Sequence, residues 1–329
     1  MRVIQVGVGG FGKSWRLALT TSPDVEVAAL VDISGDNLRE AGEALGIPST
    51  RWFSSDHLPW EEVEADAVIH SAPQNVRYQH VMRALAAGKH VLMVKPLSDR
   101  LETAIEMVED AERRGRKLVV AQQMRWHPLI LKLRQLVQSG TLGEVGYVHL
   151  DFFFPKHGYA GSYAQPYPLL VQGSIHHFDL VRWVLDCDAR RVWAENWNPS
   201  WITGHGIRAG YAAVEMESGV RVLYRSVPTQ SDHHSWLCDW RLEGTKGLAT
   251  LTNGVVRVNG DEVLALPEDL PAFNARLPEL QQEVFRQFAA YLAGREEPTI
   301  TGRRNLNSLA VSFGAIKAGE TGRRQEIGA

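Results

Sequence analysis

Residues 7–12 (GVGGFG), near the start of the chain, carry the clearest chemical signal. They fit the pattern G-x-G-x-x-G and stand between an apolar run at 3–6 and a helical pattern. In that context the first glycine allows a tight turn, the second lets the backbone approach a diphosphate, and the third lets the helix pack closely on the strand. Unpaired N–H groups at the helix N-terminus favour the anion. We expect a dinucleotide to contact five residues of this turn: Gly7, Gly9, Gly10, Phe11 and Gly12.

Two further strand ends extend the expected cofactor site. Asp32 ends the second apolar run and follows Gly12 by 20 residues, where a carboxylate binds the adenosine ribose hydroxyls. A carboxylate there repels a 2′-phosphate, so NAD is favoured over NADP. The residues after the third apolar run, whose backbone groups could line the same crevice, are Ser71, Ala72 and Pro73. The alternative for this segment is an ordinary strand-to-helix turn capped by Asn75.

The elements that would position these residues alternate between strand and helix over the first 121 residues. Continuous apolar runs, typical of strands buried on both faces, alternate with helical patterns at 76–87 and 101–114. This order predicts a doubly wound parallel sheet of the Rossmann type. The predicted strands are residues 3–6, 25–31, 65–70, 90–94 and 117–121. We expect residues 1–121 to form a dinucleotide-binding domain.

The pattern changes in residues 122–329, which we expect to form a domain for substrate binding and oligomerisation. Over 147–154, Val148 and Leu150 share one face and His149 and Asp151 the other, the period of a sheet with two different faces. Further alternating strands are predicted at 192–197, 211–217, 220–227 and 236–243, a hairpin at Asn259-Gly260, and helices at 175–185, 280–293 and 306–318. This predicts an α/β domain with a large, mostly antiparallel open sheet and helices on one face.

Composition excludes several classes of protein. The chain has 329 residues, which suits two domains, and its 35 basic and 38 acidic residues give a formal charge of -3. That balance offers no attraction to nucleic acid or to an anionic membrane. No apolar run reaches the roughly 18 residues of a membrane span, and no export signal is visible, so we expect a cytoplasmic protein. Two cysteines, Cys187 and Cys238, do not make a disulfide scaffold.

Three segments, in the right order, resemble the Gfo/Idh/MocA family, the glucose-fructose oxidoreductase and inositol dehydrogenase group. Residues 88–97 (GKHVLMVKPL) resemble the family's AGKHVxxEKP segment, residues 173–180 (GSIHHFDL) its GxHxxD helix start, and residues 242–247 (LEGTKG) a glycine turn of its C-terminal sheet. The resemblance covers essentially the whole chain. It implies a Rossmann domain plus an α/β domain whose sheet supports oligomer contacts, so a homo-oligomer, dimer or tetramer, is expected.

Lys95 and His176 match the family's motifs, and we expect both to act on the substrate. Pro96 disfavours the helical region for Lys95 and would project its amine into the cofactor crevice, where it can hydrogen-bond the reacting oxygen. A cis peptide bond at Pro96 is allowed. His176 is expected to shuttle the proton, because its ordinary pKa lies near the operating pH. The alternatives are a solvated surface lysine and a core or helix-start histidine.

The chain departs from the family pattern at two positions of the expected site. Val94 stands where the family has the glutamate of its EKP segment, and Gln172 stands where it has an aspartate, one helical turn before His176. A glutamine can hydrogen-bond a sugar hydroxyl or orient the imidazole, but it cannot take a proton. Proton transfer would then depend on Lys95 and His176 alone, or the chemistry differs.

An aromatic segment and the domain junction complete the expected site. Residues 152–167 combine aromatic side chains with glycine and proline, which suits a sugar or polyol. The alternative is a loop that packs internally or against a second subunit. The expected substrate contacts are Lys95, Arg125, Tyr163, Gln172 and His176. No metal is expected, because the adjacent His176 and His177 point in different directions and no ligand spacing supports a closed site.

These features predict an NAD-dependent oxidoreductase that transfers a hydride between the nicotinamide and a hydroxyl or carbonyl group of a sugar, inositol or related polyol. The expected catalytic residues are Lys95, Gln172 and His176. Two alternatives stay open. The missing carboxylates also suit a lyase or glycoside hydrolase of the same family, which would use tightly bound NAD through transient oxidation. An NAD-binding sensor with decayed catalysis would keep the same fold.

Overall fold

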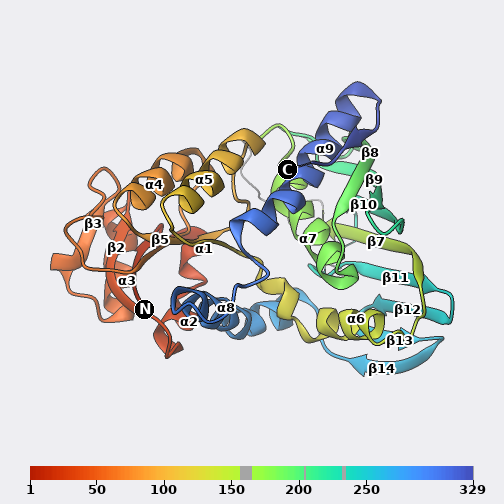
Figure 1. The fold of residues 1–329 in the computed structure, drawn as a ribbon, viewed down its shortest axis with the longest axis horizontal. Helices are drawn as coiled ribbons and strands as arrows, with labels where there is room; N and C mark the ends of the chain where they lie inside the picture. The colour runs from red at the N-terminus through yellow and green to blue at the C-terminus, as the bar shows by residue number, and fades with distance from the viewer. Residues whose placement is uncertain (156–164, 204, 232–234, 329) are drawn as a thin grey trace. The chain divides into compact units, whose positions relative to one another are not determined.

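The computed structural model of the chain describes residues 1–155, 165–203, 205–231 and 235–328. They form two compact units, and the chain passes between them more than once (Figure 1). The first unit comprises Met1–Gln123 and Leu277–Leu306, and the second comprises Met124–Arg276 and Asn307–Ala329.

The first unit is built on a parallel sheet of six strands in the order β3-β2-β1-β4-β5-β6. Its strands are β1 (Arg2–Val6), β2 (Glu26–Asp32), β3 (Trp52–Ser54), β4 (Ala67–His70), β5 (His90–Val94) and β6 (Leu118–Ala121). Most of their residues are buried, as expected for parallel strands covered on both faces. The predicted Rossmann-type sheet is therefore confirmed. Strand β3 was not predicted, because its three residues, which follow a 3₁₀ turn, are too few to show the hydrophobic alternation of a strand.

Helices cover both faces of this sheet. They are α1 (Gly10–Lys13), α2 (Arg16–Thr21), α3 (Gly35–Leu45), α4 (Gln74–Ala86) and α5 (Leu101–Arg113), joined by the later part of α8 (Leu270–Leu292). Helices α4 and α5 lie on one face, and α2 and α8 lie on the other (Figure 1). The helix expected after the glycine turn is interrupted at Ser14 and Trp15, where the buried Trp15 ring packs 5.3 Å from that of Phe285.

The segment Leu277–Leu306 returns to the first unit and covers the free edge of its sheet. The backbone N–H of Val120 donates to the carbonyl of Ile300 at 2.9 Å, and Val119 forms an antiparallel bridge with Thr301. The expected division into residues 1–121 and 122–329 differs from the observed one in this segment. The difference has a physical reason. The pairing of residues 300–301 with β6 is a long-range contact, and the hydrophobic periodicity of either segment does not indicate it.

The second unit contains a sheet of nine strands in the order β14-β13-β12-β11-β7-β10-β9-β8-β15. The strands are β7 (Val145–Pro155), β8 (Ala189–Trp197), β9 (Ala209–Met216), β10 (Arg221–Thr229), β11 (Asp239–Gly244), β12 (Gly247–Thr252), β13 (Val255–Val258), β14 (Asp261–Ala265) and β15 (Gln325–Glu326). Neighbours pair antiparallel except β7 with β10, so the expected mostly antiparallel sheet is confirmed. Asn259 and Gly260 turn β13 into β14 with positive φ angles, as a two-residue hairpin requires.

This sheet has two chemically different faces. Along β7, Val148 and Leu150 are buried, while His149 and Asp151 on the other face are only partly covered. The helices of this unit are α6 (Pro128–Gln138), α7 (Ser174–Leu185) and the later part of α9 (Gly302–Thr321). They pack on the apolar face, and the opposite face carries polar and aromatic side chains. Within the described ranges, no helix has the length and apolar character needed to cross a lipid bilayer.

Candidate functional site

The glycine turn brings three loops of the first unit into close contact. Gly7 has a φ of +79°, and a Cβ atom on it would lie 2.4 Å from the backbone nitrogen of Ala72, in the loop after β4. A Cβ on Gly12 would lie 1.8 Å from the carbonyl oxygen of Gly7. Both distances exclude any larger residue without backbone movement. The glycines therefore act as expected, one in the tight turn and the other in the close helix–strand packing.

The carboxylate of Asp32 organises the glycine turn from the end of β2. Its Oδ2 accepts hydrogen bonds from the backbone N–H groups of Val8 at 2.8 Å and Gly9 at 3.2 Å. Its Oδ1 accepts from the backbone of Ser34 and from the side-chain amide of Asn37. Burial alone would raise the pKa of Asp32, but these four hydrogen bonds outweigh it and lower the pKa below its ordinary value. Asp32 is therefore ionised at neutral pH.

The loop after β4 offers both backbone and side-chain groups at the same edge of the sheet. Ala72 is buried against Gly7, and the hydroxyl of Ser71 is buried with no hydrogen-bond partner among the described residues. Pro73, which is exposed, precedes the first residue of α4, and no side chain caps that helix. The alternative in which Asn75 caps the helix is therefore wrong, because Asn75 lies inside its first turn.

Lys95 and Pro96 follow the end of β5, next to β4 in the sheet. The peptide bond between them is cis, as the sequence allowed. Lys95 is half-buried, and burial together with the positive charge of Arg77 lowers its pKa to about 8. Val94 is buried and paired with Ala121 on β6, so an apolar side chain occupies the position of the family's glutamate. Lys95 thus exchanges its proton much closer to neutral pH than an ordinary lysine does.

A π-helical turn precedes the predicted histidine helix of the second unit. The turn covers Leu169–Gly173, and α7 begins at Ser174. Such turns inside helices are frequent at functional sites. Gln172 is half-buried in the turn, while His176 is 6% exposed in the first turn of α7. The His176 ring lies in a T-shaped arrangement with the Trp236 ring, at a centroid distance of 6.1 Å.

The neighbouring His177 belongs to a separate buried network. Its Nδ1 lies 2.8 Å from the hydroxyl of Tyr224, which is also 2.8 Å from the hydroxyl of Ser174. Its Nε2 lies 3.1 Å from the carbonyl oxygen of Trp236. Because a carbonyl only accepts, Nε2 carries the proton in this arrangement. Both ring nitrogens of His177 are engaged inside the unit, so its role is packing and orientation of α7.

Arg125 forms a buried ion pair with Asp179. Two guanidinium nitrogens of Arg125 lie 2.6 Å from the two carboxylate oxygens of Asp179, which is 1% exposed. The hydroxyl of Ser308 donates to the same carboxylate at 2.9 Å and accepts from Arg182 at 2.6 Å. This network ties the segment before α6 to α7 and α9. The expectation that Arg125 contacts the substrate stays a prediction, and the ion pair gives Arg125 a structural role in any case.

Several expected features fall elsewhere. Tyr163 lies outside the described residues, as does most of the aromatic segment around it. Gly10 and Phe11 are exposed at the start of α1. Among the described residues, no group of three His, Cys, Asp or Glu side chains is arranged to hold a metal ion.

Two residues at the carboxyl edge of the parallel sheet, here called the candidate cofactor edge, were not predicted. They are Asn37, which donates a hydrogen bond to Asp32, and Arg77, which donates to the loops after β4 and β5. Their contacts are long-range, and no local pattern marks them.

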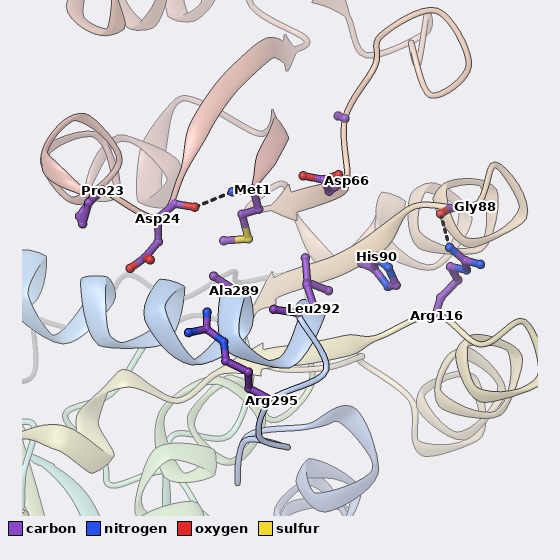
Figure 2. A pocket seen from close by; sticks show the side chains of 12 residues that line it. Met1, Pro23, Asp24, Asp66, Gly88, His90, Arg116, Ala289, Leu292 and Arg295 are labelled. Atoms are coloured by element: carbon purple, nitrogen blue, oxygen red, sulfur yellow. Dashed lines mark hydrogen bonds between the residues drawn. The ribbon is translucent and has the colours of Figure 1, made fainter.

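A separate cavity of about 630 Å³ opens at the opposite edge of the parallel sheet (Figure 2). It lies at the amino ends of β1, β4 and β5, where Met1, Asp66 and His90 begin or precede these strands. Arg295 lines it from the segment after α8. Ligands of open parallel sheets bind at the carboxyl ends of the strands. This cavity is therefore not part of the edge formed by the glycine turn, Asp32 and Lys95.

Comparison with known families agrees with this geometry. The family model described as "Oxidoreductase family, NAD-binding Rossmann fold" matches residues 1–122. The model described as "GFO/IDH/MocA C-terminal domain" matches residues 130–250. The first match lies in the first unit and the second match in the second unit, in the order that the sequence motifs indicated.

Individual relatives span a large part of the chain. The 1,5-anhydro-D-fructose reductase of Ensifer adhaerens is 24% identical over 340 residues, which cover 98% of this chain and 97% of the relative. The myo-inositol 2-dehydrogenase of Thermotoga maritima is 26% identical over 195 residues, which cover 59% of this chain and 58% of the relative. The crystal structure of an oxidoreductase from Agrobacterium radiobacter, in complex with NAD⁺, L-tartaric acid and magnesium, has the same fold. It superposes with a TM-score of 0.86 and 20% identity, covering 99% of this chain and 98% of that one.

We predict that Asp179→Asn lowers the free energy of unfolding by about 3–5 kcal/mol, because Arg125 keeps its charge in a buried position without a charged partner. Ser308→Ala, which removes one hydrogen bond from the same carboxylate and one acceptor of Arg182, should cost about 1–3 kcal/mol. Urea denaturation followed by tryptophan fluorescence measures both. An Asp179→Asn protein of unchanged stability would contradict a structural role for the pair and would favour Arg125 as a substrate contact.

Proposed function

The chain belongs to the Gfo/Idh/MocA family of oxidoreductases, and from this membership we propose that it is an NAD-dependent dehydrogenase of a sugar, inositol or related polyol. The observation that carries the proposal is the carboxyl edge of the parallel sheet. The glycine turn follows β1, Asp32 ends β2, and Lys95 follows β5, so the expected cofactor-binding groups and the amine share one edge. Such an edge is where open α/β sheets bind their ligands.

The residues at this edge fit a pyridine dinucleotide. A Cβ atom on Gly7, Gly9 or Gly12 would meet protein atoms, so these glycines let the turn pack tightly, whereas the Cβ position of Gly10 is open. The buried hydroxyl of Ser71 is a candidate hydrogen-bond donor. The ionised Asp32 would accept hydrogen bonds from ribose hydroxyls and repel a 2′-phosphate, which supports NAD over NADP. When bound, the nicotinamide supplies a hydride acceptor for the oxidation.

We assign the proton and charge chemistry to Lys95 and His176. A lysine with a pKa of about 8 is mostly protonated at neutral pH, so Lys95 can donate a hydrogen bond to the substrate oxygen and stabilise negative charge on it. His176 would take the hydroxyl proton, and Gln172 would orient either the imidazole or the substrate.

The substrate class comes from the relatives and stays a proposal. Two relatives are named for a cyclic polyol and a sugar derivative, and both are dehydrogenases or reductases of hydroxyl or carbonyl groups. Arg125 and Tyr163 are proposed as further substrate contacts. No described feature favours the lyase, the glycoside hydrolase or the decayed sensor over the dehydrogenase.

We predict that the purified protein binds NAD⁺ and forms NADH with at least one member of a panel of inositols, aldoses and sugar derivatives. Lys95→Met should lower kcat by about a hundredfold or more while NAD⁺ binding persists, because the donor to the developing oxyanion is lost. Absorbance at the NADH band measures the rate, and calorimetry measures the binding. Lys132→Met, at a partly exposed position of α6, is the matched control. Tight NAD⁺ binding with no turnover on the whole panel would defeat the dehydrogenase proposal.

We predict that Asp32→Ser raises the affinity for NADP⁺ relative to NAD⁺ by about tenfold or more, because it removes a negative charge beside the 2′ position. Titration of each nucleotide against the wild type and the variant gives the ratio. Asp36→Ser, an exposed carboxylate on α3, controls for a general change of charge. An unchanged ratio would mean that Asp32 supports the glycine turn without selecting the cofactor.

We also propose that the chain forms a homo-oligomer through the outer face of its nine-stranded sheet. Phe153, Trp193 and Leu223 are large apolar side chains exposed on that face, and Trp193 and Leu223 flank Ala213 in one row across β8, β9 and β10. Exposed apolar patches of this kind favour association.

Leu223→Asp is predicted to lower the molar mass seen by light scattering to that of a smaller assembly or a monomer, because it places a charge in the row. Leu270→Asp, at an exposed position of α8, is the control and should leave the mass unchanged. A wild-type protein that is monomeric at micromolar concentration would contradict the oligomer.

A further inference from the structure

Arg77 is a buried cation that joins two loops of the cofactor edge. It lies in the first turn of α4 and is 3% exposed. One nitrogen of its guanidinium donates to the carbonyl oxygen of Ala72 at 3.1 Å, and another donates to the carbonyl oxygen of Pro96. Ala72 belongs to the loop after β4, and Pro96 directly follows Lys95 after β5. A planar guanidinium is suited to holding two acceptors at a fixed separation.

These contacts continue the close packing that begins at the glycine turn. The backbone of Gly7 approaches that of Ala72 so closely that no Cβ fits between them. Arg77 then connects Ala72 to Pro96. The loop after β1 therefore contacts the loop after β4, and Arg77 joins the loop after β4 to the loop after β5, which contains Lys95.

The charge of Arg77 acts on the groups around it. Burial lowers the pKa of Arg77 to about 10, and the carboxylate of Asp99 opposes this shift, so the guanidinium is charged at neutral pH. Burial lowers the pKa of Lys95 first, and Arg77 lowers it further. Burial, then Arg77 and His80, hold the pKa of His70 well below its ordinary value, so that imidazole stays neutral.

Arg77 is a positive charge among the groups around Lys95. The position before Lys95 is occupied by the buried, apolar Val94, so no carboxylate adjoins the amine in the strand. The titratable groups of the neighbouring elements are His70 on β4, Arg77 and His80 on α4, and Asp99 in the segment after Pro96. Of these, Arg77 is the charge that lowers the pKa of Lys95 after the larger effect of burial.

We propose that Arg77 is a positioning residue of this site: its guanidinium fixes the loops after β4 and β5 and presents a permanent positive charge to Lys95. The proposal deepens the dehydrogenase assignment and rests on it for its catalytic meaning. Arg77 itself does not act on the substrate; it sets where the Lys95 amine lies and the pH range in which that amine exchanges its proton.

Three variants of Arg77 separate its charge from its hydrogen bonds. Arg77→Lys keeps the charge but loses the planar guanidinium that donates to two carbonyl groups. Arg77→Gln keeps hydrogen-bonding capacity without charge, and Arg77→Met keeps neither. Arg83→Gln removes an exposed charge from the same helix and is the matched control. Circular dichroism and thermal melting show which variants are folded, and Arg77→Lys serves if the neutral variants do not fold.

The first measurement is the titration of Lys95 in the apoprotein. Competitive acetylation over a pH series, with the Lys95 peptide quantified by mass spectrometry, follows the unprotonated amine. The midpoint for the wild type is expected at about 8. It should move upward by roughly half a unit or more in Arg77→Gln and Arg77→Met, because a neighbouring positive charge is gone. It should stay near the wild-type value in Arg77→Lys and Arg83→Gln.

The second measurement is NAD⁺ affinity by calorimetry, together with the pH profile of kcat/KM. Arg77→Lys and Arg77→Met should both weaken NAD⁺ binding by roughly tenfold, since each loses part of the connection between the loops. The midpoint of the pH profile should move with the acetylation midpoint, and only in the neutral variants. A merely structural role would change affinity and melting temperature without moving either midpoint.

The outcomes separate this proposal from the proposed function. Folded neutral variants whose Lys95 midpoint stays at the wild-type value would overturn the role of Arg77, even if the protein oxidises a polyol. A Lys95 midpoint that shifts as expected in a protein without dehydrogenase activity would support the electrostatic role and defeat the dehydrogenase. If the neutral variants are unfolded, a wild-type midpoint near that of an ordinary lysine, or an Arg77→Lys midpoint well above the wild-type one, would overturn the proposal.

Discussion

The candidate cofactor edge depends on two places where the backbone cannot carry a side chain. Gly12 packs against the carbonyl of Gly7, and Gly7 packs against the backbone of Ala72. These contacts set the spacing of the loops after β1 and β4 before any side chain contributes. Asp32 and Arg77 then hold the same loops from either side, the first through the N–H groups of the glycine turn and the second through carbonyl oxygens. A negative group thus engages backbone donors, and a positive group engages backbone acceptors.

In the second unit, buried charged side chains join two helices. Its histidine helix α7 carries Asp179 and Arg182, which are both buried and both in contact with Ser308 of α9. Adjacent residues of this helix have different surroundings. His177 has both ring nitrogens engaged by Tyr224 and the Trp236 backbone, whereas the His176 ring lies in a T-shaped arrangement with the Trp236 ring. Neighbouring histidines on a helix face different directions, so one can fix the helix while the other is proposed to act on substrate.

Much of this architecture was predictable because its signals are local. The buried parallel strands are continuous apolar runs, and β7 alternates strictly, so both sheets follow from their periods. The glycine turn was predictable from spacing and context. The π-helical turn before α7, the short strand β3 and the break after α1 were not, because each depends on tertiary packing that overrides local preference. Arg77 was missed for the same reason: an arginine in an amphipathic helix looks like a solvated residue until its two carbonyl acceptors are known.

The antiparallel pairing of residues 300–301 with β6 has a consequence for how this protein is made. An uncovered edge of a parallel sheet presents a row of backbone donors and acceptors to any strand that meets it. Here β6 ends at Ala121 and the covering residues are 300–301, so a growing polypeptide keeps that edge open while most of the second unit is synthesised. The first unit is therefore completed only after most of the second unit has been synthesised, and its open edge can mispair during that interval.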